Sequence, residues 1–215
     1  MATELKAEVE FNKVIRERHS VRKYDSAWKI SEEDIKEILG DAILAPSSSN
    51  LQPWRFIVVT DQALKEQLLS IAYNQQQVVE ASATIVVVGD TEAYRNAERI
   101  SEDAVAAGYI TAEVGAAMAK RSSDGYSKLP AAKLKEIALV DGGLVSMQLM
   151  LAAKARGYDT VPMGGFNPDG LRELFNLPGR YEPVMLISVG KAAVEAHSTA
   201  RLPLAEVTHW NGFAE

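Results

Sequence analysis

Two arginines flank a hydroxyl group near the start of the chain, in the run Arg18-His19-Ser20-Val21-Arg22. A guanidinium group can bind phosphate through two parallel N–H donors, and a hydrogen bond to a charged group contributes about 1.5–3 kcal/mol. The run therefore has the composition of an anion clamp. A solvated basic turn after an N-terminal helix would have the same composition, and five residues alone do not separate the two.

A second segment, Pro46-Ser47-Ser48-Ser49-Asn50-Leu51-Gln52-Pro53-Trp54, concentrates hydroxyl and amide groups between an expected helix and an expected strand. These side chains supply neutral donors and acceptors that suit the polar edge of a ring or a polyol chain. We interpret the segment as a small-molecule contact. The alternative is an Asx or Ser turn anchored by Pro53 and Trp54, and we expect Trp54 to be structural in either case.

Two further segments have polar or flexible compositions. Asn74-Gln75-Gln76-Gln77 is dense in amides, which either meet a polar ligand or form the polar surface of a helix. Pro162-Met163-Gly164-Gly165-Phe166 follows an expected strand. Its glycines would let a flat ligand approach the backbone closely, although a plain turn has the same composition.

Cationic residues return late in the chain, with Gly190-Lys191 at the end of an expected strand and Arg201 ten residues further on. Taken singly, such side chains are usually solvated surface charges. No metal site is predicted, because the histidines are dispersed without ligand spacing, at His19, His197 and His209. There is also no Gly-x-Gly-x-x-Gly after a strand and no Walker-type loop, so no dedicated dinucleotide fold is visible.

The composition narrows the class of function. A net charge of −6 argues against nucleic-acid binding, which needs a clustered basic surface. The absence of cysteine excludes thiolate nucleophiles and cysteine-ligated metals, so redox chemistry would require a bound cofactor. Residues 1–8 hold no apolar signal-peptide core, and no span of about 20 apolar residues follows. We expect a cytoplasmic protein with no membrane partner, folded as a single domain over residues 1–215.

The apolar pattern predicts an α+β layout around a central sheet. Ser31-Glu32-Glu33-Asp34 has the form of a capping box, and the helix that it starts has an apolar face of Ile35, Ile38, Leu39, Ala42 and Ile43. Strands are predicted at Arg55–Thr60, Thr84–Gly89, Tyr158–Val161 and Val184–Val189. Ile137–Ala153 predicts a core helix that is too short for a membrane span and is broken by a glycine pair.

These segments occur in the same order in the FMN-dependent nitroreductase family, which the chain resembles over nearly its whole length, including a late Arg201-Leu202-Pro203. The resemblance implies a three-layer α/β/α fold with a central, mostly antiparallel sheet, in an intertwined homodimer. It also implies FMN as the cofactor and NAD(P)H as the reductant.

Carried over position by position, the resemblance implies that Arg18, Lys191 and Arg201 surround the FMN phosphate. The loop from Pro46 would approach a flavin held chiefly by the other subunit, Asn74 would meet the pyrimidine edge, and a backbone N–H of the 162–166 turn would point at flavin N5. The full set of implied FMN contacts is Arg18, His19, Ser20, Arg22, Pro46, Ser47, Ser48, Asn50, Gln52, Asn74, Gln77, Pro162, Met163, Gly164, Gly165, Gly190, Lys191 and Arg201.

Three positions depart from patterns in the family. Gln77 stands where one branch has Lys, so Arg22 would have to supply the positive charge beside the reduced flavin. Gly164 stands where one relative has Glu, which leaves a backbone contact with N5 possible but removes a side chain near the substrate. Thr199 stands where some relatives have a lysine near the phosphate.

The resemblance implies an enzyme in which hydride passes from the nicotinamide to flavin N5 and then to a nitroaromatic, a quinone or a similar small acceptor, by a ping-pong mechanism. No side chain need act as a catalyst, because the cofactor carries the chemistry. Two alternatives stay open: a member specialised for enone reduction, dehalogenation or flavin breakdown, and an FMN-binding regulatory protein without turnover. Residues 91–133, which would roof the site, carry no readable motif.

Overall fold

The computed structural model describes residues 11–213 and contains one four-stranded antiparallel sheet in the order β1-β2-β4-β3. The strands are β1 (Trp54–Val59), β2 (Ala83–Asp90), β3 (Asp159–Met163) and β4 (Tyr181–Gly190). The helices are α1 (Phe11–Glu17), α2 (Glu32–Ala42), α3 (Gln62–Ile71), α4 (Gln77–Glu80), α5 (Ala97–Ala106), α6 (Ala112–Tyr126), α7 (Ala131–Ala155) and α8 (Pro168–Leu174), with short 3-10 turns η1 (Ser48–Asn50), η2 (Ala93–Asn96) and η3 (Leu204–Glu206). The expected α+β class and antiparallel sheet are confirmed.

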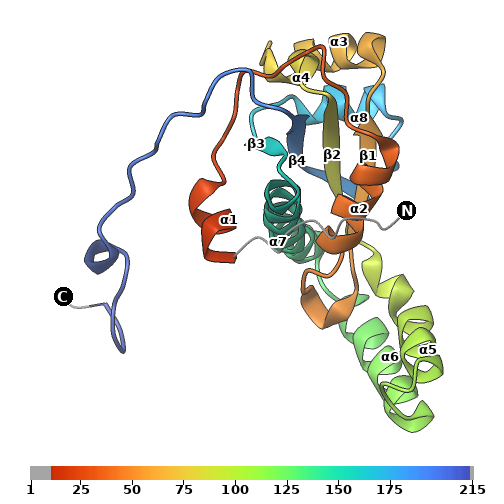
Figure 1. The fold of residues 1–215 in the computed structure, drawn as a ribbon. Helices are drawn as coiled ribbons and strands as arrows, with labels where there is room; N and C mark the ends of the chain where they lie inside the picture. The colour runs from red at the N-terminus through yellow and green to blue at the C-terminus, as the bar shows by residue number, and fades with distance from the viewer. Residues whose placement is uncertain (1–10, 214–215) are drawn as a thin grey trace, which may run out of the picture.

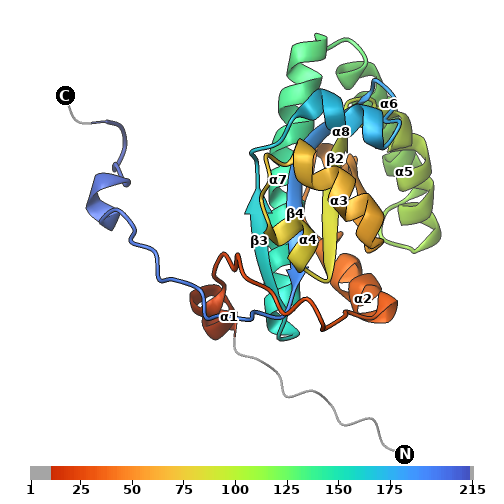
Figure 2. The ribbon, with the colours of Figure 1, turned by 90° about the horizontal axis from the view of Figure 1, so that it is seen from above.

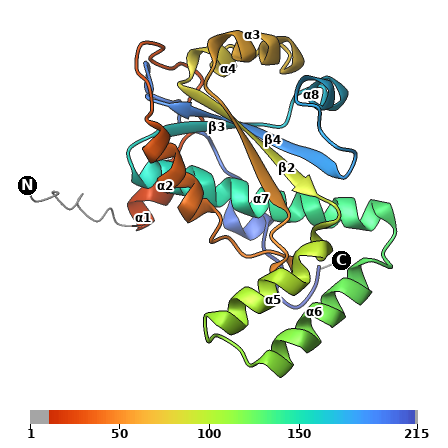
Figure 3. The same cartoon turned by 90° about the vertical axis from the view of Figure 1, so that its right-hand side faces the viewer.

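The sheet lies between two helical layers (Figure 3), which confirms the three-layer expectation. Successive side chains of a strand point to opposite faces. Ile85 and Val87 of β2 accordingly pack with α2 and α7, whereas Val86 and Val88 pack with α3, α4 and α8. Each face of the sheet therefore has its own apolar core.

The start of α2 follows the predicted cap with one difference. The Ser31 hydroxyl accepts a hydrogen bond from the Asp34 N–H at 3.0 Å, and it donates to the Asp34 carboxylate at 2.6 Å. The carboxylate therefore meets the hydroxyl, where a full capping box would have it meet a backbone N–H. On the predicted apolar face Ile35, Ile38 and Ala42 are buried and Leu39 is partly buried. Ile43 lies beyond the helix end and is exposed, so its assignment to the apolar face of the helix was wrong.

Strands β3 and β4 are longer than predicted. Pro162 and Met163 were expected in a turn, but they pair with Ile187 and Leu186 inside β3. β3 is an edge strand, where the missing N–H of a proline is tolerated. β4 starts at Tyr181, before the expected Val184, and the register shifts between Val87 and Val88 where β4 pairs with β2. Because this irregularity and Pro183 interrupt the alternation expected of a strand, the first part of β4 was not predicted.

Helix α7 is also longer than predicted and runs unbroken through Gly142 and Gly143. By length and composition it could cross a membrane, but half of its most apolar stretch is buried inside the protein. A Cβ on Gly142 would lie 2.7 Å from a γ-carbon of Val184 on β4, so this glycine permits close packing of the helix on the sheet. We therefore interpret α7 as the central helix of the core, and the expectations that it is short and broken were wrong.

Two parts of the chain stand away from this body. Helices α5 and α6 form a projecting hairpin within residues 91–133, where no motif is readable (Figures 1 and 3). After β4 the chain runs outward as an extended tail that carries η3 (Figure 2). Large apolar side chains on this tail are exposed, with Trp210 86% and Phe213 85% accessible.

Candidate flavin site

The arginine-rich segment lies against the end of strand β3. Ser20 forms a parallel bridge with Thr160, and the Val21 N–H donates to the Thr160 carbonyl at 3.1 Å. Arg18, His19 and Ser20 are half-buried, while Arg22 is exposed and donates to the Ser20 carbonyl at 3.4 Å. The backbone of the predicted anion clamp is thus fixed to the sheet, and the guanidinium of Arg22 remains near solvent.

The amide cluster and the glycine segment lie next to one another. Gln75 Nε2 donates to the Gly165 carbonyl at 2.8 Å, and Gln77 Nε2 donates to the Met163 sulfur at 3.4 Å. Gln77 and Met163 are buried, so their side chains have partners within the chain. Gln75 was not among the predicted contacts, and nothing in a run of four amides distinguishes the one that joins the two segments.

At the junction of the amide cluster and the glycine segment, the backbone is accessible to solvent. Gly164 and Gly165 are exposed, and a Cβ built on Gly164 meets nothing within 4 Å among the described residues. Asn74 is exposed and has a φ of 58°, next to Tyr73 with a φ of 53°. Left-handed backbone at a residue other than glycine costs of order 1–3 kcal/mol and gathers at binding sites. The junction therefore offers backbone and amide groups to a flat polar ligand.

The short helix α4 contacts both the segment that follows the anion clamp and helix α3. The Glu80 carboxylate accepts a hydrogen bond from the Tyr24 N–H at 3.4 Å and pairs with Lys23 at 3.6 Å. On the other side Lys65 is fully buried, and its ammonium donates to the carbonyls of Val79 and Ala81 at 3.2 and 2.7 Å. Burial lowers the pKa of Lys65. Sequence reasoning missed Lys65 and Glu80, because exposed and buried lysines look alike in a helical pattern.

The serine-rich loop, residues 46–54, is held by hydrogen bonds within the loop and to two other helices. Ser47 Oγ accepts from the Gln52 N–H at 3.0 Å, and Ser49 Oγ lies 3.0 Å from Tyr126 Oη. Ser48 donates both its N–H and its hydroxyl to the Asp141 carboxylate, at 3.1 Å. Left-handed backbone recurs here, at Ser49, Asn50 and Gln52. Pro46, Ser49 and Asn50 are exposed.

A cavity of about 200 Å³ separates this loop from the α5–α6 hairpin. It is bordered by Asn50 on the loop and, on the hairpin, by the apolar side chains of Ile100, Ala104, Ile110 and Met118. A larger hollow of about 700 Å³ lies between α5 and α6 and contains none of the predicted contacts. We place the candidate site at the smaller cavity, because the loop with the strained backbone borders it.

The loop and the anion clamp lie at opposite ends of the sheet. Ser20 pairs with Thr160 of β3, and Thr160 pairs with Val189 of β4. Val189 in turn pairs with Ala83, the first residue of β2. Pro53, at the end of the loop, accepts a hydrogen bond from Asp90, the last residue of β2. Eight extended residues span roughly 25 Å. One chain therefore does not bring its own clamp and its own loop together.

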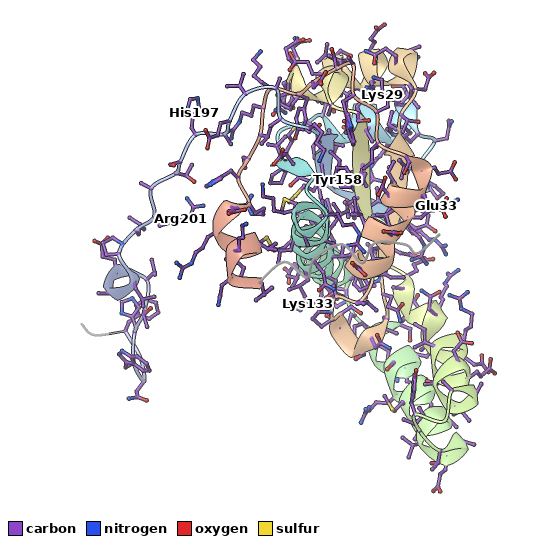
Figure 4. All side chains as sticks on the ribbon, in the orientation of Figure 1. Lys29, Glu33, Lys133, Tyr158, His197 and Arg201 are labelled. Atoms are coloured by element: carbon purple, nitrogen blue, oxygen red, sulfur yellow. The ribbon has the colours of Figure 1, made fainter. Side chains whose placement is uncertain are left out.

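The residues predicted to surround the phosphate are not assembled either. Lys191 donates to the Gly157 carbonyl, and its ammonium lies 4.7 Å from the centre of the Tyr158 ring. Arg201 lies on the extended tail, well away from Tyr158 (Figure 4), and donates to the carbonyls of Thr199 and Ala200. Gly190 has a packing role, because a Cβ there would lie 2.9 Å from the Tyr24 ring. Within one chain, Arg201 thus lies apart from Lys191, and the two form no common phosphate site.

Comparison with known proteins shows which family the chain resembles. The family model described as the nitroreductase family matches residues 15–191. YdgI of Bacillus subtilis, provisionally named an NAD(P)H nitroreductase, is 45% identical over 94% of this chain and 97% of its own. A provisionally assigned nitroreductase from Exiguobacterium sibiricum, crystallised in complex with FMN, is 42% identical and superposes with a TM-score of 0.91 over 96% of this chain and 99% of its own.

One relative carries a different activity in its name. The CLA biosynthesis enone reductase of Lactiplantibacillus plantarum is 36% identical over 91% of this chain and 89% of its own. Identity at this level across almost the full length, together with the matched family model and the shared fold, goes well beyond a likeness of motifs. The chain belongs to the nitroreductase family.

Proposed function

We propose that the protein is an FMN-dependent NAD(P)H oxidoreductase whose flavin site is completed by two copies of the chain. The observation that carries the proposal is the separation of the anion clamp and the serine-rich loop to opposite ends of one sheet, roughly 25 Å apart. Two halves of a site that do not meet within one chain can meet between two chains. The relative crystallised with FMN supports the choice of cofactor.

The residues present fit an FMN molecule. Arg18 and Arg22 offer guanidinium donors to anionic groups, and Asn74 offers an amide beside the open glycines Gly164 and Gly165. Bound FMN would supply hydride transfer at its N5 atom. The chain's own residues bind and orient the ring system, and a backbone N–H of the Gly164–Gly165 segment would face that atom. No side chain of the site is needed as a nucleophile.

The proposed assembly is a homodimer in the cytoplasm. The outer face of α7 exposes Val140, Leu144 and Met147, a larger apolar patch than single scattered residues would give. The extended tail also exposes large apolar side chains and carries Arg201. A second copy would cover both surfaces and would let the tail deliver Arg201 to an FMN phosphate.

Hydride donor and acceptor should take turns at one face of the flavin. The sequence carries no separate dinucleotide-binding motif, so NAD(P)H and the oxidising substrate would share the space beside the 200 Å³ cavity. Shared space predicts ping-pong kinetics, with parallel double-reciprocal lines when NAD(P)H is varied at several fixed acceptor concentrations. Intersecting lines, with donor and acceptor bound together, would contradict this mechanism.

The acceptor is a nitroaromatic, a quinone or a compound of similar shape in the leading proposal. An enone is a second candidate, favoured by the enone reductase among the relatives and by the apolar residues of α5 and α6 at the cavity. The test is to reduce the enzyme anaerobically and measure its reoxidation by each acceptor class. The class that reoxidises it fastest at equal concentration identifies the preference.

The function itself is tested by the visible spectrum of the purified protein. We expect flavin absorption bands, release of FMN rather than FAD on denaturation, and bleaching by NADH or NADPH under anaerobic conditions. A colourless protein that does not take up FMN would overturn the proposal. Bound FMN that neither nucleotide reduces would instead indicate a flavin-binding protein without turnover.

A further inference from the structure

Asp141 is a buried carboxylate in the middle of the apolar helix α7, with only 2% of its surface accessible. A buried carboxylate is costly unless hydrogen bonds satisfy its oxygens. Both hydrogen-bond donors to Asp141 come from Ser48, whose N–H contacts the two carboxylate oxygens and whose hydroxyl contacts one of them. Among the described residues, the Asp141 carboxylate therefore accepts hydrogen bonds only from the serine-rich loop.

The residues that follow Ser48 need such an anchor. Ser49, Asn50 and Gln52 all have left-handed φ values, between 49° and 55°. Side-chain-bearing residues keep this conformation only where the surroundings determine it. Ser48 directly precedes Ser49. Hydrogen bonds to both the N–H and the hydroxyl of Ser48 therefore fix the backbone where the left-handed residues begin.

A second contact restrains the loop from another helix, α6. Ser49 Oγ is hydrogen-bonded to Tyr126 Oη at the end of α6. Asp141, Ser48 and Tyr126 border one small cavity of about 20 Å³, room for about one water molecule. Packing beneath the loop is therefore tight, and the loop is held between α7 and α6.

We propose that Asp141 is a positioning residue that fixes the serine-rich loop in the conformation with which it completes the flavin site of the other copy. This inference rests on the proposed function, because it takes the loop to contact a flavin held by the partner. Asp141 itself touches Ser48 and need not touch the cofactor.

The first measurement is the dissociation constant for FMN, from quenching of flavin fluorescence on titration into apoprotein. Asp141→Asn has nearly the same shape but no charge, and it loses part of the accepting capacity that Ser48 uses. We expect about tenfold weaker binding, which corresponds to about 1.4 kcal/mol. Ser146→Ala is the matched control, because Ser146 is buried on the same helix and donates only to its own helix carbonyl at Gly142. Equal affinities of Asp141→Asn and Ser146→Ala would overturn the proposal.

The second measurement separates positioning of the loop from general damage to the fold. Mixed dimers of Asp141→Asn and Arg18→Ala chains, carrying different affinity tags, would be purified and titrated with FMN. If the loop serves the partner, one of the two sites combines an intact clamp with an intact loop. We expect half of the sites to bind with wild-type affinity and the other half to bind more weakly than in either parent.

A mixed dimer with no site of wild-type affinity, in which one site is weakened as in Asp141→Asn and the other as in Arg18→Ala, would overturn the proposal. That is the result if Asp141 acts within its own chain. Failure of the proposed function gives a different result, because the wild-type protein would then bind no FMN at all. The two failures are therefore distinguishable by the wild-type titration.

Discussion

At the scale of single residues, we propose that the phosphate half of the site depends on charged hydrogen bonds from Arg18 and Arg201. Replacing either with Ala should weaken FMN binding by about ten- to a hundredfold, since such a bond contributes about 1.5–3 kcal/mol. Arg16→Ala is the control, because Arg16 is exposed on the neighbouring helix α1. Fluorescence titration measures all three. Wild-type affinity of both variants would remove these residues from the site.

Lys191 should behave differently from the two arginines. Its ammonium already donates to the Gly157 carbonyl and lies over the Tyr158 ring. Lys191→Met should therefore weaken FMN binding less than Arg18→Ala does in the same titration. A loss as large as that of Arg18→Ala would show that the lysine turns toward the phosphate when FMN binds, as the family resemblance implied.

Lys65 gives a prediction about pH. Burial lowers the pKa of its ammonium from an ordinary value of 10.5. Between the lowered pKa and 10.5 the unfolded chain binds more protons at this position than the folded chain does, so the contribution of Lys65 to the free energy of unfolding rises with pH. The wild type should gain stability relative to Lys65→Met as the pH rises through this window. Denaturant unfolding at several pH values measures the difference, and a pH-independent difference would contradict the assignment.

Sequence reasoning found the segments that face the site but not the residues that hold them. Arg18, Asn74 and Gly164 were selected because their chemistry suits a flavin, and the structure leaves them at least partly accessible. Asp141 lies inside the apolar run that predicted the core helix and was not selected as a functional residue. Its partner Ser48 lies 93 positions away in the sequence, and no local pattern reports a contact over that distance.

At the scale of elements, the packing of α7 on the sheet depends on one of its two adjacent glycines. Gly142→Ala would place a Cβ 2.7 and 2.8 Å from the two γ-carbons of Val184, whereas a Cβ on Gly143 meets nothing within 4 Å among the described residues. Overpacking typically costs 1–3 kcal/mol, more than the gain of about 1 kcal/mol in helix propensity. Gly142→Ala should lower the free energy of unfolding, and Gly143→Ala should not. Equal effects in denaturant unfolding would mean that Val184 moves aside.

Helix and strand types were predictable where periodicity was strong, and the errors have local causes. β1 and β2 were found within one residue at each end, because β-branched runs mark them clearly. The start of β4, from Tyr181 to Pro183, was missed, since Pro183 and a register shift interrupt its pattern. No motif was readable in the segment of α5 and α6, which projects from the body and has much of its surface exposed (Figure 3).

At the scale of the whole molecule, dimerisation and FMN binding should be lost together. Leu144→Glu places a charge on the exposed apolar face of α7 and should dissociate the dimer. Val58→Glu is the control, because Val58 is similarly exposed, at 37% against 43%, but lies on the edge strand β1 and not on α7. Gel filtration and FMN titration report the two properties separately. A Leu144→Glu monomer that binds FMN with wild-type affinity would contradict a shared site.

The most direct test of the central claim is sedimentation velocity followed at both protein and flavin wavelengths. A site built from the clamp of one chain and the loop of another requires both chains to contribute to each bound flavin. We predict that flavin absorbance sediments only with the dimer, at one FMN per chain, and that diluting the protein until it dissociates leaves the flavin absorbance unsedimented. A monomer that sediments with a full complement of FMN would contradict the account.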